Sequence, residues 1–265
     1  VYKRQLYDLL SQHDIDYIKW DMNRYMTEVF SLTQANDRQG EIFHRYILNL
    51  YRLFDRLTSQ FPKILFESCS SGGARFDPGL LYYAPQVWTS DDSDAIERLK
   101  IQYGTSIVYP LSTMGCHVSE VPNQQVSRLT PLETRANVAY FGAFGYELDL
   151  SELTTTELHE VKEQIAFYKR ARKTFQYGRF TRLMSPFEDS STAWQVMSES
   201  QEELFVGFYR SLIMANEGNQ RLYLKDLDET ATYQVNNQAV YSGSSLMYAG
   251  LPIASEDFPT GLKDF

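Results

Sequence analysis

The chain has 265 residues, with 34 acidic against 25 basic side chains, a net charge of −9 and a pI near 5.0. This acidic balance argues against nucleic acid and anionic membrane surfaces as partners. The sequence contains no apolar run of about 18 residues, the length that a spanning helix needs. Two cysteines do not indicate a disulfide framework. We therefore expect a cytoplasmic protein that binds neither nucleic acid nor membranes.

Apolar strands alternate with helices along the first two thirds of the chain. After a helical pattern at residues 6–10, strands are predicted to end near residues 15–21, 63–69, 85–91, 107–117 and 139–147. The intervening helices include an amphipathic stripe over residues 42–57 and another over residues 158–168. This alternation predicts a parallel α/β barrel over residues 1–176. Short alternating patterns then predict an antiparallel β domain over residues 177–265, with strands at 180–184, 193–197, 204–209, 221–224, 233–235 and 245–248.

The first predicted strand ends in charged and polar side chains. It runs into Lys19, Trp20, Asp21, Met22 and Asn23. Burying a charge is costly unless the charge is paired, and α/β barrels place their chemistry at the carboxyl ends of their strands. The segment is therefore either an ordinary solvated strand exit with a Lys–Asp pair or part of an active site.

Two later strands end in the same way. The strand at 64–66 opens onto a small, glycine-rich loop that contains Glu67, Cys69 and Ser71. The strand that ends at Trp88 opens onto an Asp/Ser cluster over residues 90–94, ahead of a helical pattern. A helix N-cap would account for Ser93 and Asp94. It does not explain the tryptophan, and it leaves one of Asp91 and Asp92 without a role.

At these positions the sequence resembles the α-galactosidases of glycoside hydrolase family 36. The resemblance rests on four blocks in order, 19–23, 69–77, 88–91 and 117–149. It implies a (β/α)8 TIM-type barrel, of which about strands 4–8 are present, followed by a small antiparallel β-sandwich domain. It also implies a retaining hydrolase that releases terminal α-galactosyl groups from oligosaccharides such as raffinose or melibiose, and a homotetramer for the complete enzyme.

The resemblance assigns roles to individual residues. A retaining mechanism needs one nucleophilic and one proton-donating carboxyl group. Asp21 matches the nucleophile and Asp91 matches the acid/base. The residues that match the substrate-binding positions are Lys19, Trp20, Met22, Asn23, Cys69, Ser71 and Trp88. Neither a metal nor a cofactor is expected.

Three of these interpretations have alternatives. Trp20 is equally suited to packing in the core. Cys69 suits a small buried side chain or, with His117, a thiol nucleophile, whereas the resemblance implies a chemically inactive residue that lines the sugar pocket. The same motifs fit a transglycosylating relative, similar to the raffinose and stachyose synthases.

The length of the barrel portion raises a further alternative. A closed barrel of this type takes about 250 residues, and only residues 1–176 precede the β domain. We therefore expect the chain to be the C-terminal part of a longer enzyme. If the chain were the whole natural product, an inactive carbohydrate-binding fragment would become the better interpretation.

Overall fold

The computed structural model describes residues 2–23, 27–213, 219–236 and 239–253, and these fall into two compact units. The N-terminal unit comprises Val1–Asp91 with Thr113–Gly115, and the C-terminal unit comprises Asp92–Ser112 with Cys116–Phe265. None of the described helices is both long enough and apolar enough to cross a bilayer.

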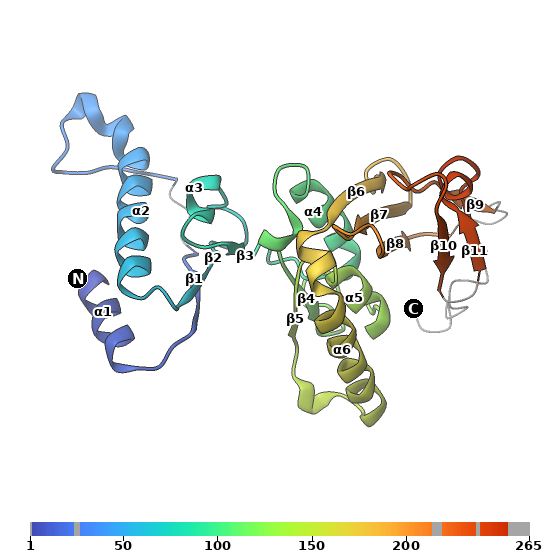
Figure 1. Cartoon of the computed structure of the whole chain (residues 1–265). Coiled ribbons are helices and arrows are strands. Elements are labelled where there is room, and N and C mark those ends of the chain that lie inside the picture. The colour runs from blue at the N-terminus through green and yellow to red at the C-terminus, as the bar shows by residue number, and fades with distance from the viewer. Residues whose placement is uncertain (1, 24–26, 214–218, 237–238, 254–265) are drawn as a thin grey trace. The chain divides into compact units, whose positions relative to one another are not determined.

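The N-terminal unit consists of a small parallel sheet with helices on one face (Figure 1). Its elements are α1 (Tyr2–Gln12), β1 (Tyr17–Asp21), η1 (Asn36–Glu41), α2 (Ile42–Gln60), β2 (Leu65–Cys69), α3 (Pro78–Leu81) and β3 (Gln86–Val87). The strands β1, β2 and β3 are neighbours in that order and run parallel. These three strands confirm the first three predicted strand positions.

The core of this unit lies between α2 and the sheet. The predicted stripe of α2 buries Leu50, Phe54 and Leu57. Phe66 of β2 and Trp20 of β1 belong to the same apolar cluster. Because successive side chains of a strand point to opposite faces, Lys19 and Asp21 on β1, and Glu67 and Cys69 on β2, lie on the face away from this cluster.

The first part of the C-terminal unit continues the strand–helix alternation. Its elements are α4 (Ala95–Thr105), β4 (Gly115–Ser119), α5 (Leu132–Ala139), β5 (Ala143–Glu147), η3 (Leu150–Glu152) and α6 (Thr155–Tyr177), and the short η2 (Leu111–Thr113) precedes β4. The strands β4 and β5 pair with each other. They overlap the predicted positions near residues 107–117 and 139–147, although residues 107–114 lie outside β4. Ile107 and Val108 instead form exposed turns that close α4, through hydrogen bonds to the carbonyls of Gly104 and Thr105.

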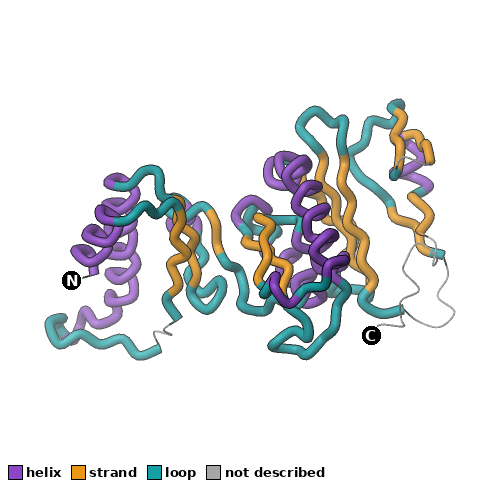
Figure 2. Tube along the Cα trace, turned by 90° about the horizontal axis from the view of Figure 1, so that it is seen from below, coloured by secondary structure: helices purple, strands orange, loops and turns teal. Residues whose placement is uncertain are grey.

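The rest of the C-terminal unit is antiparallel. Its strands are β6 (Arg179–Met184), β7 (Ser191–Met197), β8 (Leu204–Arg210), β9 (Gln220–Leu222), β10 (Thr232–Val235), β11 (Ala239–Ser242) and β12 (Leu251–Ile253). They form the sheets β6-β7-β8, β10-β11 and β12-β9. The helix α6 lies against the larger sheet (Figure 2). The rings of Phe175 on α6 and Phe205 on β8 are 4.7 Å apart. Met197, Leu222 and Leu246 belong to the apolar core of this part.

The predicted strand at 245–248 is wrong. Residues Ser245–Ala249 form a turn of π-helix, which closes where the N–H of Gly250 donates to the carbonyl of Ser245 at 3.0 Å. Leu246 on this turn is buried, so its apolar character serves the core without a strand. Periodicity over four residues does not distinguish a strand from a helical turn. The strands β11 and β12 were not predicted.

Candidate active site

The strand ends of the N-terminal unit bring several predicted site residues together. Lys19 Nζ lies 4.7 Å from the centre of the Trp88 ring, a distance at which a cation and an aromatic face attract each other. Trp88 is only 3% exposed, and its backbone N–H donates to the carbonyl of Ser68 at 2.9 Å. The ends of β1 and β3 therefore share a cation–aromatic contact.

Asp21 is held as a carboxylate. Its Oδ2 accepts a hydrogen bond from Asn23 Nδ2 at 2.9 Å. Partial burial opposes ionisation, but hydrogen bonds from the Asn23 amide and the Cys69 thiol outweigh it. Together with the Met22 N–H and the charge of Lys19, they bring the pKa of Asp21 below its usual value. An ionised carboxylate at neutral pH is the form that a nucleophile requires.

The thiol of Cys69 donates a hydrogen bond to the carboxylate of Asp21. Burial, and then the neighbouring Asp21 carboxylate, raise the pKa of its thiol to about 11. The thiol therefore stays protonated at neutral pH, whereas nucleophilic cysteines react as thiolates. This chemistry argues against the thiol-nucleophile alternative.

The glycine-rich loop is tied to the end of β1. Asn23 Oδ1 accepts from Ser71 N at 2.8 Å and from Ser71 Oγ at 3.2 Å. Ser71 and Gly72 have φ values of 48° and 76°, so the loop turns through the left-handed region. The amide of Asn23 therefore bridges the loop and the carboxylate of Asp21.

The same loop packs closely on the segment that carries Asp91. A Cβ at Gly72 would lie 2.7 Å from Ser90 Cα and 3.1 Å from Asp91 N. A Cβ at Gly73 would lie 2.9 Å from the carbonyl oxygen of Thr89. Only glycine allows the two backbones to approach this closely. A continuous path of contacts thus runs from Asp21 through Asn23 and the loop to the backbone of Asp91.

The other acidic residues of the cluster serve the start of α4. Asp94 is the N-cap, and its Oδ2 accepts from the N–H groups of Ile96 and Glu97 at 3.1 and 3.0 Å. Asp92 Oδ1 accepts from Asp94 N at 3.1 Å. The N-cap interpretation is therefore confirmed for Asp94. Ser93 has a different role, because its Oγ accepts from Asn123 Nδ2 at 3.2 Å.

Two predicted substrate-binding residues face the helix side instead. The Trp20 ring lies 4.8 Å from that of Phe54 in the core, which favours the packing alternative. The Sδ atom of Met22 accepts a hydrogen bond from the hydroxyl of Tyr46 at 3.7 Å. Substrate binding by Trp20 and Met22 stays a prediction.

Sequence reasoning did not assign roles to two residues that support the site. Arg75 donates to the carbonyl of Met22 at 2.5 Å and to the Tyr46 hydroxyl at 2.9 Å. Glu67 is 2% exposed and accepts hydrogen bonds from Tyr17 and, at 3.3 Å, from Gln86. An arginine in a loop of small residues, and a glutamate inside a buried strand, were the signals available in the sequence.

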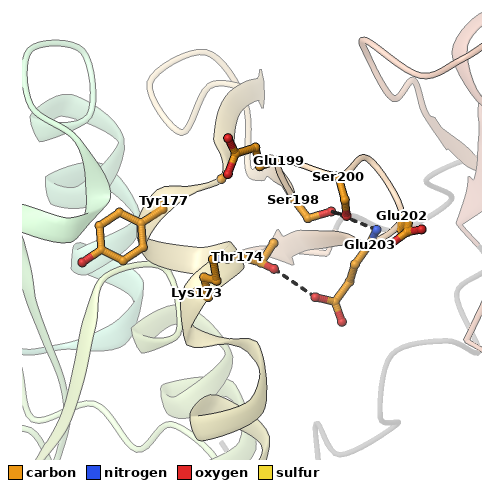
Figure 3. Close-up of a pocket in the computed structure, with 9 residues that line it drawn as sticks. Lys173, Thr174, Tyr177, Ser198, Glu199, Ser200, Glu202 and Glu203 are labelled. Carbon is orange, nitrogen blue, oxygen red and sulfur yellow. Dashed lines mark hydrogen bonds between the residues drawn. The ribbon is translucent and has the colours of Figure 1, made fainter.

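The described part of the chain contains no group of three or more His, Cys, Asp or Glu side chains that could hold a metal ion. A separate cavity of about 490 Å³ lies where the end of α6 meets the β7–β8 turn (Figure 3). Its polar lining includes Lys173, Glu199 and Glu202, and Thr174 Oγ1 donates to Glu203 Oε2 at 3.0 Å. None of the predicted site residues lines it.

The parallel strands with their helices, followed by antiparallel sheets, define an α/β protein with a C-terminal β domain. A family model described as Melibiase matches residues 1–178, and one described as Glycosyl hydrolase family 36 C-terminal domain matches residues 191–265. The chain belongs to the melibiase family, glycoside hydrolase family 36. The predicted family and fold class are confirmed.

Similar proteins are α-galactosidases. The chain is 54% identical over 253 residues to alpha-galactosidase AgaA of Geobacillus stearothermophilus, covering 95% of this chain and 35% of that protein. It is 44% identical to alpha-galactosidase 1 of Pediococcus pentosaceus, covering 98% of this chain and 36% of that protein. The chain thus spans about a third of the length of these relatives.

Solved structures of α-galactosidases match the fold of this chain. The crystal structure of AgaA matches with a TM-score of 0.92 at 52% identity, covering 95% of this chain and 35% of that one. An AgaA variant in complex with raffinose matches with the same TM-score, identity and coverage.

Proposed function

We propose that the protein carrying this chain is a retaining α-galactosidase that releases terminal α-galactosyl groups from oligosaccharides such as raffinose or melibiose. The observation that carries the proposal is the Asp21 carboxylate, which Asn23 and Cys69 hold in its ionised form on the polar face of the sheet. Relatives named as α-galactosidases, one of them with a structure containing raffinose, support the choice of substrate.

In the first step, the carboxylate of Asp21 attacks the anomeric carbon and forms a glycosyl ester. The bond from that carbon to the leaving-group oxygen breaks, and Asp91 gives its proton to that oxygen. In the second step, Asp91 takes a proton from water, whose oxygen attacks the anomeric carbon and releases Asp21. The two inversions give net retention. In this proposal, Lys19, Trp88 and Ser71 contact the sugar around Asp21.

The test follows the anomeric proton of the first-formed galactose by NMR during hydrolysis of an α-galactoside by the natural protein. A retaining enzyme releases α-galactose first, and initial release of β-galactose would exclude the double displacement. A transfer product in place of free galactose would identify a transglycosylating relative.

The assignment of the acid/base is tested by two neighbouring variants. Asp91→Asn removes the proposed proton donor, so hydrolysis of raffinose should fall by about 10²–10⁴-fold. Asp92→Asn is the matched control, because an amide oxygen can still accept from Asp94 N. Equal losses in the two variants would contradict the assignment to Asp91.

We also propose a homotetramer in the cytoplasm. The resemblance to family 36 implies the assembly, and the net charge of −9 disfavours anionic surfaces. Light scattering on the natural protein and fractionation of its source cells test these two proposals. A monomer, or recovery outside the cytoplasm, would overturn the corresponding proposal.

A further inference from the structure

The side chain of Asn23 directs both ends of its amide toward the protein. Its Nδ2 donates to Asp21 Oδ2 at 2.9 Å, and its Oδ1 accepts from both the N–H and the hydroxyl of Ser71. The resemblance to family 36 implies a different use for this residue, substrate binding. With two donors on Oδ1, the acceptor side of the amide is filled by the loop, and a sugar hydroxyl could use only the second hydrogen of Nδ2.

We propose that Asn23 is a positioning residue, which couples the glycine-rich loop at Ser71 to the carboxylate of Asp21. This inference rests on the proposed function of Asp21 as the nucleophile. An amide suits the task because it combines a donor for a carboxylate with an acceptor for a backbone N–H. An aspartate would keep the acceptor and lose the donor, and a leucine of similar size would lose both.

The coupling has a geometric consequence. Ser71 has a φ of 48°, a backbone conformation that non-glycine residues adopt only when surrounding contacts fix it. The two hydrogen bonds to Asn23 are such contacts. Gly72, the next residue, packs on the backbone of Ser90 and Asp91. Asn23 therefore holds Asp21 and supports the loop on which the acid/base segment rests.

The coupling also has an electrostatic consequence. A hydrogen bond donated to a carboxylate favours its ionised form. Among the described residues, the charged or titratable groups that act on Asp21 are Lys19 on β1 and Cys69 on β2, and the guanidinium of Arg75 is bound to the carbonyl of the next residue, Met22. All three remain in an Asn23 variant. A change in the ionisation of Asp21 in such a variant therefore reports the loss of the amide donor.

The experiment measures kcat/KM against pH for the natural protein and for Asn23→Leu. We expect the acid limb of the variant's curve of kcat/KM against pH to move up by roughly one pH unit. Loss of the hydrogen bond raises the pKa of Asp21, and hydrogen bonds to charged groups are among the stronger ones. On that limb, activity should be about tenfold below the wild type at equal pH. We also expect kcat to fall more than KM rises. An unmoved limb with an increase confined to KM would show that Asn23 only binds sugar, and would overturn the proposal.

Two further variants distinguish the role of the amide donor of Asn23 from that of its acceptor. Asn23→Asp keeps the acceptor for Ser71 but places a second negative charge beside Asp21, so its limb should move further than that of Asn23→Leu. Ser71→Ala is the matched control, because it removes the 3.2 Å bond and keeps the 2.8 Å bond from the backbone. Its limb should stay in place. A limb that moves as far in Ser71→Ala as in Asn23→Leu would contradict the assignment to the amide donor.

A readout without activity distinguishes failure of this inference from failure of the proposed function. The carboxyl carbon of Asp21 can be titrated by NMR in the natural protein and in the Asn23 variants. A higher pKa in Asn23→Leu supports the coupling even if no α-galactoside is hydrolysed. An unchanged pKa would overturn the coupling whatever the enzyme's substrate.

Discussion

Gly72 is the point where the loop next to Asn23 meets the segment of Asp91, and Gly72→Ala perturbs this contact directly. Its φ of 76° lies in the left-handed region, which costs an L-residue roughly 1–2 kcal/mol. The new Cβ would also lie 2.7 Å from Ser90 Cα, a backbone atom that cannot rotate away. Overpacking of this kind costs about 1–3 kcal/mol. We therefore expect Gly72→Ala to lower the free energy of unfolding by about 2–5 kcal/mol.

The same substitution should lower activity, because relief of the clash moves the backbone of Ser90 and Asp91. A displacement near 1 Å at a catalytic group costs about 100-fold in rate. The assays are urea unfolding followed by tryptophan fluorescence, and kcat on an aryl α-galactoside.

Gly104→Ala is the matched control. Gly104 lies in α4, and a Cβ there would meet no atom within 4 Å. Alanine at this position should raise stability by about 0.5–1 kcal/mol and leave kcat unchanged. If Gly72→Ala behaved like Gly104→Ala in both assays, the close approach of the loop to Ser90 and Asp91 would be refuted.

Three further predictions concern single side chains. Asp91→Asn should slow raffinose far more than an activated aryl α-galactoside, whose leaving group needs little protonation, and equal losses would argue against proton donation. Cys69→Ser should keep most of kcat, because a hydroxyl still donates to Asp21. In the unchanged protein, iodoacetamide should label Cys69 slowly at pH 7, because its thiol has a pKa of about 11. Rapid labelling would contradict a protonated thiol. Phe54→Ala should lower the free energy of unfolding by about 3–5 kcal/mol, because Phe54 is 1% exposed and its ring packs between Trp20 and Phe66. Urea denaturation measures this loss, and a loss below about 1 kcal/mol would contradict the packing.

Much of the fold follows from patterns that burial imposes on the sequence. The α2 stripe around Phe54 and the strands β1, β2 and β3 were predicted because long helices and buried strands repeat at fixed periods. The predicted secondary structure was wrong only in short segments. Residues 245–248 form a helical turn and residues 107–108 close a helix, because hydrogen bonds to a few carbonyls decided their conformation.

The site was predictable in its residues and not in its connections. The block around Asp21 and the Asp94 cap are local patterns, which a sequence displays directly. The bond between Asn23 and Ser71 joins residues from different strand ends and depends on one backbone conformation. The contacts of Arg75 likewise depend on the fold of the loop. Residue types alone do not specify such contacts.

The most direct test of the account is to trap the intermediate on Asp21. The natural protein is incubated with a fluorinated α-galactosyl substrate that forms the glycosyl ester quickly and hydrolyses it slowly, and the digested protein is analysed by mass spectrometry. Asp21→Asn serves as the control, because an amide does not form the ester. If Asp21 is the nucleophile, the peptide that contains it gains one fluorogalactosyl mass, and the variant gains none. A label on the peptide that contains Asp91, or an active enzyme that acquires no label, would contradict it.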